Sequence, residues 1–180
     1  MLTAAHCVED RGKIVPVNFQ LNYRDGEFTA QANSVSARVG TLEPEKDYAG
    51  DWAVVVLDKD LGSANGYLGF APPTKLILPL QVLFAGYSSD FSGGEIAGID
   101  HCQILNKFAN SYGHDCSMRP GASGGPLFYI EKGHYYIVGV NTKEDPNKSP
   151  SDPYTQENAN LSTWTESLYN TLLSLRAQFP

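Results

Sequence analysis

Residues 119–128, RPGASGGPLF, combine a reactive side chain with a strong constraint on the backbone around it. Ser123 stands among Gly121, Gly124 and Gly125, and glycine permits backbone angles and close approaches that other residues do not. A serine on such a turn exposes its hydroxyl, and the N–H groups of Gly121 and Ser123 can point to one spot where an oxyanion would form. A plain glycine-rich turn is the alternative, so a nucleophilic role needs support from residues elsewhere in the chain.

The residues after Ser123 distinguish two fold classes. The pattern Gly-x-Ser-x-Gly also occurs in α/β hydrolases, where a helix follows the serine and the histidine comes last in chain order. Here Pro126 and an apolar run follow, which favours a strand. His134 is the one histidine after Ser123, and it precedes Asp145 and Asp152, so the order of that fold is not met. We expect His134 at the exposed start of a strand. The stretch therefore favours an all-β fold.

The rest of the chain shows the pattern of short strands joined by turns. Residues 14–42 alternate apolar and polar side chains around a turn at Asp25-Gly26. Further strands are expected at 51–62, 80–88, 94–105, 125–130 and 134–142, with a connector at 62–79 and a polar loop at 143–158. We predict one barrel or sandwich in each half, over residues 1–75 and 76–160.

The C-terminal segment has a different period. Its apolar side chains recur at helical spacing, and they are Leu161, Trp164, Leu168, Leu172 and Leu175. We predict one amphipathic helix over 161–180, capped by Asn160 or Ser162 and packed on the barrels. A helix lying on a membrane surface is the alternative, but the segment has one arginine and no lysine, whereas such helices carry several cations.

Composition excludes several function classes. The 180 residues are 42% hydrophobic and 18% charged, which is typical of a folded domain. The net charge of −7 argues against nucleic acid as a partner, because a phosphate backbone would be repelled. No apolar run reaches the roughly 18 residues that span a membrane, and no leader peptide is visible. We expect a monomer that contacts neither nucleic acid nor membrane.

A serine nucleophile needs a base, and the base needs a carboxylate that fixes its tautomer. His6 lies in LTAAHC, residues 2–7, and Asp51 opens the apolar run DWAVVVL, residues 51–57. A carboxylate beside a buried strand must find a partner, because burial of an unpaired charge is costly. Asp47 is the rival acid, but no apolar strand follows it, so we prefer Asp51 as the partner of His6.

TAAHC, DWAVV and GASGGP resemble, in this order, the three catalytic motifs of the trypsin/chymotrypsin-like serine peptidases. VLFAGYS and IVGVNT also resemble two strands of the second barrel of that family. The resemblance implies a chymotrypsin-like double β-barrel that hydrolyses peptide bonds without a cofactor. It implies His6 as general base, Asp51 as its orienting partner, Ser123 as nucleophile, and an oxyanion hole formed by the N–H groups of Gly121 and Ser123.

The chain departs from the trypsin pattern around the substrate pocket. Ala122 stands where trypsin-like digestive enzymes carry an aspartate, which makes the chain more similar to the bacterial, glutamyl-endopeptidase-like branch. Ser117 stands where trypsin has its acidic specificity residue, and Asn141 where glutamyl endopeptidases have a histidine. We expect Ser117, Asn141 and Thr142 to line a small polar pocket, and the preferred substrate residue stays open.

The three cysteines suggest an oxidising compartment. The resemblance implies a disulfide between Cys102 and Cys116, whereas the family partner of Cys7 would lie upstream of Met1. A zinc site formed with His101 and His114 is the alternative, but adjacent His-Cys pairs do not match the usual ligand spacing. We expect no metal, and we expect a secreted or periplasmic protein.

The position of His6 so close to Met1 adds a structural expectation. The family places two strands before the histidine motif, so we expect the first barrel to be incomplete and the activity of these residues alone to be weak. The alternative function is an inactive, peptidase-like binding or scaffold protein.

Overall fold

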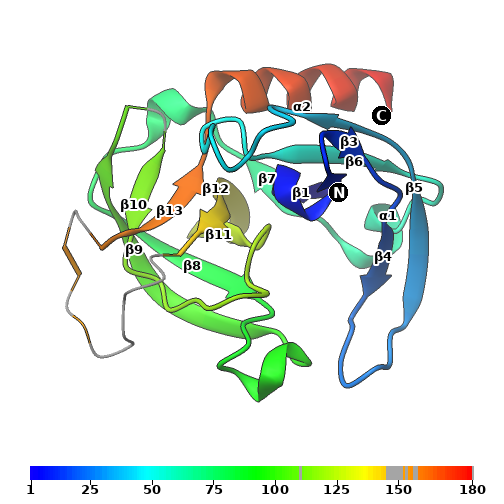
Figure 1. The fold of residues 1–180 in the computed structure, drawn as a ribbon, viewed down its shortest axis with the longest axis horizontal. Coiled ribbons are helices and arrows are strands. Elements are labelled where there is room, and N and C mark those ends of the chain that lie inside the picture. Colours follow the sequence, from blue (N-terminus) through cyan, green and yellow to red (C-terminus); the bar gives the residue numbers. More distant parts are fainter. Residues whose placement is uncertain (110, 145–151, 153, 156–157, 180) are drawn as a thin grey trace.

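The computed structural model describes residues 1–109, 111–144, 152, 154–155 and 158–179. Its strands form two units side by side, and one long helix lies across them (Figure 1). The predicted polar loop at 143–158 falls largely outside the described residues. The predicted all-β class is confirmed.

The N-terminal unit is an open antiparallel sheet of four strands. Their order is β1 (Leu2–Thr3), β6 (Ala53–Leu57), β5 (Ala30–Val39) and β4 (Asn18–Leu21). Two further short strands, β2 (Glu9–Asp10) and β3 (Lys13–Ile14), pair with each other. Within the described residues, β1 and β4 are edge strands, so the unit is a half-barrel, as expected of an incomplete first barrel.

The hairpin between β4 and β5 turns at Asp25-Gly26, as predicted. Asp25 and Gly26 both have positive φ, of 50° and 84°. Arg24 and Glu27 exchange backbone hydrogen bonds of 2.8 and 2.9 Å around them. Two central residues with positive φ define the tight turn whose twist matches that of the flanking strands.

The C-terminal unit is a closed barrel. Its sheet runs in the order β11 (Pro126–Glu131), β8 (Leu80–Gly86), β9 (Gly98–Lys107), β10 (Tyr112–His114), β13 (Asn160–Thr163), β12 (His134–Lys143) and β7 (Gly69–Phe70). Strand β11 also pairs with β12, so six strands close into a ring. The seventh strand, β7, pairs with β12 in parallel and is not part of the ring. Closure removes the unpaired edges that an open sheet would leave.

Short helical turns connect these strands. They are η1 (Ala5–Cys7), α1 (Gly62–Asn65), η2 (Pro73–Lys75) and η3 (Ser92–Gly94).

The C-terminal helix is shorter than predicted. It begins at Glu166 and ends at Gln178 as α2, and Thr165 caps it by accepting a hydrogen bond from the Leu168 N–H group at 3.2 Å. The expected caps were wrong, because Asn160 and Ser162 belong to β13, which completes the barrel between β10 and β12. In the described part of the chain, no helix is long and apolar enough to cross a membrane.

One hydrophobic core joins the two units. Trp52 and Val54 of the first unit belong to the same buried cluster as Phe84 and Leu127 of the barrel. Trp164, just before α2, is buried in this cluster and donates its indole N–H to the Ala71 carbonyl at 2.9 Å. The shared core holds the units in one relative position, which places residues from both at the site described next.

Candidate active site

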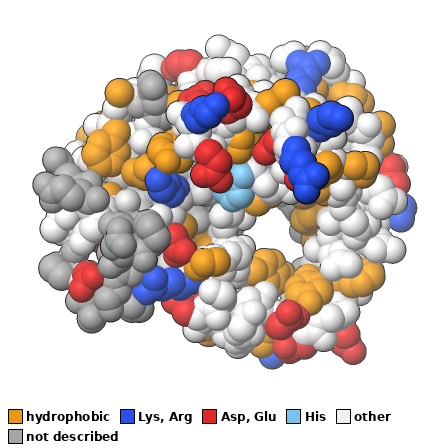
Figure 2. Space-filling view, viewed as in Figure 1, with side chains coloured by type: hydrophobic (Ala, Val, Ile, Leu, Met, Phe, Trp, Pro, Cys, Tyr) orange, Lys and Arg blue, Asp and Glu red, His pale blue; other side chains and the backbone are white. Residues whose placement is uncertain are grey.

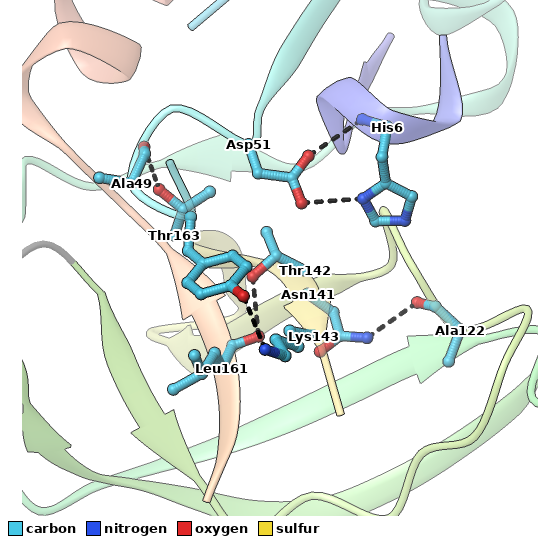
Figure 3. Close-up of polar contacts among 10 residues, drawn as sticks. His6, Ala49, Asp51, Ala122, Asn141, Thr142, Lys143, Leu161 and Thr163 are labelled. Atoms are coloured by element: carbon cyan, nitrogen blue, oxygen red, sulfur yellow. Dashed lines mark hydrogen bonds and ion pairs between the residues drawn. The ribbon is translucent and has the colours of Figure 1, made fainter. Parts of the chain in front are cut away.

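His6 and Asp51 face each other at one end of the β1–β6 pair. Strand β1 pairs antiparallel with β6 and sets Thr3 opposite Ala53. His6 follows β1 and Asp51 precedes β6, so both residues lie at the same end of this strand pair. The Asp51 carboxylate accepts from His6 Nδ1 at 2.8 Å and from the His6 backbone N–H at 3.0 Å (Figure 3).

Burial and hydrogen bonding make this pair electrostatically strong. Asp51 is only 2% exposed, whereas 32% of the His6 side chain remains open to solvent. The hydrogen bond that His6 donates to Asp51, followed by one with the Cys7 side chain, raises the pKa of His6 from 6.5 to about 10, and burial opposes the shift. Asp51 therefore stabilises the charged imidazolium form of His6.

The loop before Asp51 is anchored to the closed barrel. Lys143 donates to the Tyr48 hydroxyl at 2.7 Å, and the Thr163 hydroxyl donates to the Ala49 carbonyl at 2.8 Å. The rival acid Asp47 is exposed and accepts the Gly50 N–H at 3.1 Å instead of facing His6. These contacts agree with the prediction that Asp51, and not Asp47, is the partner of His6.

The turn that carries Ser123 packs against the segment leading into His6. Gly121 and Gly124 have φ of 100° and 80°, which favour glycine. A Cβ at Gly124 would lie 2.1 Å from Thr3 Oγ1 and 3.1 Å from the Ala4 nitrogen, so no side chain fits there. The strand and turn are thus in direct contact, and Ser123 is partly exposed.

Within the described residues, no hydrogen bond joins the Ser123 hydroxyl to His6. Catalytic hydrogen bonds are often long without substrate and tighten when it binds.

The backbone N–H groups around Ser123 divide into two sets. Those of Ala122, Gly124 and Gly125 donate within the chain, to the carbonyls of Arg119 at 3.1 Å, Asn141 at 2.8 Å and Ala122 at 3.1 Å. The N–H groups of Gly121 and Ser123 have no acceptor in the part of the chain that the structure describes. These two are the groups predicted for the oxyanion hole.

The predicted pocket residues differ in their exposure. Ser117 is exposed, and its N–H donates to Asp100 at 2.6 Å. Asn141 and Thr142 are buried, and each donates from its side chain to a backbone carbonyl at 3.1 Å, Asn141 to Ala122 and Thr142 to Leu161 (Figure 3). A direct role of these residues in substrate binding stays a prediction.

The cysteines and the other histidines were the candidate ligands of the alternative metal site. Cys102 and Cys116 form a disulfide, so neither thiolate is available as a ligand, while Cys7 is exposed and free. His101 is exposed on β9, whereas His114 is fully buried in β10. His134 lies at the exposed start of β12, as predicted. No group of three potential metal ligands occurs among the described residues.

The surface is hollowed between the half-barrel and the closed barrel (Figure 2). Charged side chains of both signs lie near this hollow on the visible face, and hydrophobic and uncharged surface borders much of it (Figure 2). A concave surface between two packed units is a typical place for a ligand to bind.

Comparisons with known proteins identify the family. Residues 1–140 match the trypsin-like peptidase domain, and the chain belongs to this family. The sequence matches no curated protein. The resemblance to trypsin-like serine peptidases is therefore confirmed.

Solved structures with the same fold include microbial proteases and a Glu endopeptidase. A Glu endopeptidase in complex with MPD aligns with a TM-score of 0.77 and 19% identity, over 98% of this chain and 80% of that one. The thermostable serine protease AL20 from an extremophilic microorganism gives 0.72 and 20% identity, over 94% and 80%. The protease Anisep from Arthrobacter nicotinovorans gives 0.67 and 20% identity, over 94% and 81%.

The contacts that assemble the site leave no local signal in the sequence. Neither the packing of Gly124 on Thr3 nor the bond between Lys143 and Tyr48 has a local signal, because each joins residues far apart in the chain. The cluster of glycines around Ser123 was the one hint that another segment approaches closely there.

Proposed function

We propose that the chain is a serine endopeptidase that cleaves peptide bonds through an acyl-enzyme, with His6, Asp51 and Ser123 as its catalytic residues. The observation that carries the proposal is the His6–Asp51 pair, with Nδ1 and Oδ2 2.8 Å apart, beside a turn that presents Ser123. Membership of the trypsin-like peptidase family supports peptide bonds as the substrate class.

In the proposed acylation step, Ser123 Oγ bonds to the carbonyl carbon of the scissile peptide, and its proton passes to His6 Nε2. The carbonyl oxygen becomes an oxyanion, which the N–H groups of Gly121 and Ser123 stabilise. His6 then returns the proton to the leaving nitrogen as the C–N bond breaks. The new N-terminus departs, and an ester to Ser123 remains.

Deacylation repeats these steps with water as the nucleophile. Water gives one proton to His6 and bonds to the ester carbon, and the same two N–H groups hold the second oxyanion. Collapse breaks the bond to Ser123 Oγ, which recovers its proton from His6, and the acid product leaves.

Asp51 acts on this chemistry through His6. Because its carboxylate accepts from Nδ1, the neutral imidazole carries its proton on Nδ1 and leaves Nε2 free to accept. The same bond stabilises the imidazolium formed in each step, which is the state favoured by the raised pKa of His6.

Further parts of the proposal concern specificity and location. Ser117 and Thr142 are assigned to a small polar pocket, of which Ser117 is the exposed member. The Cys102–Cys116 disulfide supports an extracellular or periplasmic protein, because disulfides persist in oxidising compartments. The protein is assigned as a monomer.

A labelled fluorophosphonate tests the proposal, because it reacts with activated serines only. We expect labelling of the wild type and of Ser36→Ala, which removes an exposed serine from β5, but not of Ser123→Ala or His6→Ala. Thermal unfolding of each variant establishes that it is folded. A folded wild type that stays unlabelled would overturn the proposal in favour of an inactive, peptidase-like scaffold protein.

A further inference from the structure

Asn141 on β12 makes polar contacts to the Ser123 turn with both its side chain and its backbone. We propose that Asn141 is a positioning residue, which fixes the orientation of the Ala122–Ser123 peptide and so aims the Ser123 N–H at the developing oxyanion. This inference rests on the proposed function and assigns Asn141 a different task from lining the substrate pocket.

Three hydrogen bonds connect Asn141 to the turn. Its side-chain NH₂ donates to the Ala122 carbonyl at 3.1 Å. Its carbonyl accepts from the Gly124 N–H at 2.8 Å, and its N–H donates to the Gly125 carbonyl at 2.9 Å. Asn141 therefore forms hydrogen bonds with residues on both sides of Ser123, and none of the hydrogen bonds within the described residues joins it to Ser123 itself.

The side-chain bond acts on the oxyanion donor through the geometry of the peptide. The Ala122 carbonyl and the Ser123 N–H belong to one planar trans peptide, so they point in opposite directions. The Ala122 carbonyl accepts from the buried Asn141 side chain and from the Gly125 N–H, each at 3.1 Å. With the carbonyl held inward, the Ser123 N–H is turned outward, where it has no acceptor among the described residues.

Burial shows that Asn141 acts on the turn and not on solvent. Asn141 is 0% exposed, and its amide reaches toward Ala122 (Figure 3). Its orientation is decided by chemistry, since only the NH₂ group can donate to a carbonyl. Its Oδ1 then has no donor within the described residues.

A leucine of similar shape would fill this space without leaving a buried oxygen unpaired. The feature that asparagine adds at this position is therefore the donor to Ala122.

Two variants separate this donor from packing. Asn141→Leu keeps the number and branching of the side-chain heavy atoms and removes the donor, whereas the larger Asn141→His keeps an N–H at Nδ1, the same number of bonds from the backbone as Nδ2. Asn160→Leu is the matched control, because Asn160 is a buried asparagine of the same barrel that donates to the Cys116 carbonyl at 2.8 Å.

The readout is the saturation kinetics of labelling by a fluorophosphonate, whose phosphonyl oxygen occupies the oxyanion hole. We expect Asn141→Leu to lower the maximal labelling rate about 10- to 100-fold, somewhat less than outright loss of an oxyanion donor. The half-saturating concentration should change by less than about twofold, because ground-state binding is not affected. Asn141→His should recover most of the rate, and Asn160→Leu should keep it.

Two results would overturn the inference while leaving the proposed function intact. One is an unchanged maximal rate in folded Asn141→Leu, and the other is a change confined to half-saturation, which would assign Asn141 to the substrate pocket. If the wild type does not react, the proposed function fails separately. A crystal structure of Asn141→Leu then tests the inference. An Ala122–Ser123 peptide with the same orientation as in the wild type would refute it.

Discussion

Replacing Asp51 by asparagine changes the chemistry of the site with little change in shape. The new amide can keep its oxygen toward the His6 backbone N–H, which lies 3.0 Å from Asp51 Oδ1. Its NH₂ group then faces His6 Nδ1, where the carboxylate stands at 2.8 Å. Because NH₂ can only donate, Nδ1 must become the acceptor, and the imidazole proton moves to Nε2, where it blocks uptake of the Ser123 proton.

We expect this substitution to lower kcat about 10⁴-fold, or about 5.5 kcal/mol of transition-state stabilisation. The pH dependence should change as well. Protonated His6 cannot act as a base, so wild-type kcat/KM should fall as the pH drops below the raised His6 pKa of about 10. Without the carboxylate, the midpoint of this acid limb should move down toward 6.5, the ordinary value for histidine.

The assay is kcat/KM on one peptide substrate from pH 5 to 11, with thermal unfolding as the folding control. The loss of charge-assisted bonding should lower the free energy of unfolding by about 1–3 kcal/mol, a drop of about 2–12 °C in Tm. Asp47→Asn, in the same loop but exposed, is the matched control. A folded Asp51→Asn protein that keeps a tenth of wild-type kcat, or an unshifted acid limb, would refute the reasoning.

Two further substitutions test the assembly of the site and of the barrel. Gly124→Ala should lower kcat/KM at least about 100-fold, because its Cβ would lie 2.1 Å from Thr3 Oγ1. Gly133→Ala is the control and should keep activity, because Gly133 has a similar φ of 79° and no atom within 4 Å of its Cβ position. Equal losses in the two variants would contradict the role of the contact between Gly124 and Thr3. Replacing Cys102 and Cys116 together by serine should lower the free energy of unfolding in urea by about 3 kcal/mol, since the disulfide spans 14 residues. A loss no larger than that of Cys7→Ser would show that the disulfide does not form.

The parts of the fold that were predicted correctly depend on local chemistry. The hairpin at Asp25-Gly26 was predictable because positive φ at both central residues is a property of those residues and their neighbours. The His6–Asp51 pair was predictable because a carboxylate beside a buried strand needs a partner, and the motif order supplied one.

Strand β13 shows where local pattern failed. Leu161 and Trp164 fit a helical period, yet residues 160–163 are a strand, because the backbone groups of β10 and β12 need partners to close the barrel. The need for these pairing partners arises from β10 and β12, which lie outside the sequence segment around Leu161. The residues near Leu161 therefore cannot reveal it.

The sequence by itself determined which side chains are candidates for the proposed chemistry, since the turn at Ser123 and the residue types of His6 and Asp51 are local properties. Only the tertiary structure decided how they are arranged. The packing of Gly124 on Thr3 and the bond from Asn141 to the Ala122 carbonyl join distant segments. Such contacts form because close packing of the shared core leaves each turn one position in which its buried polar groups are paired.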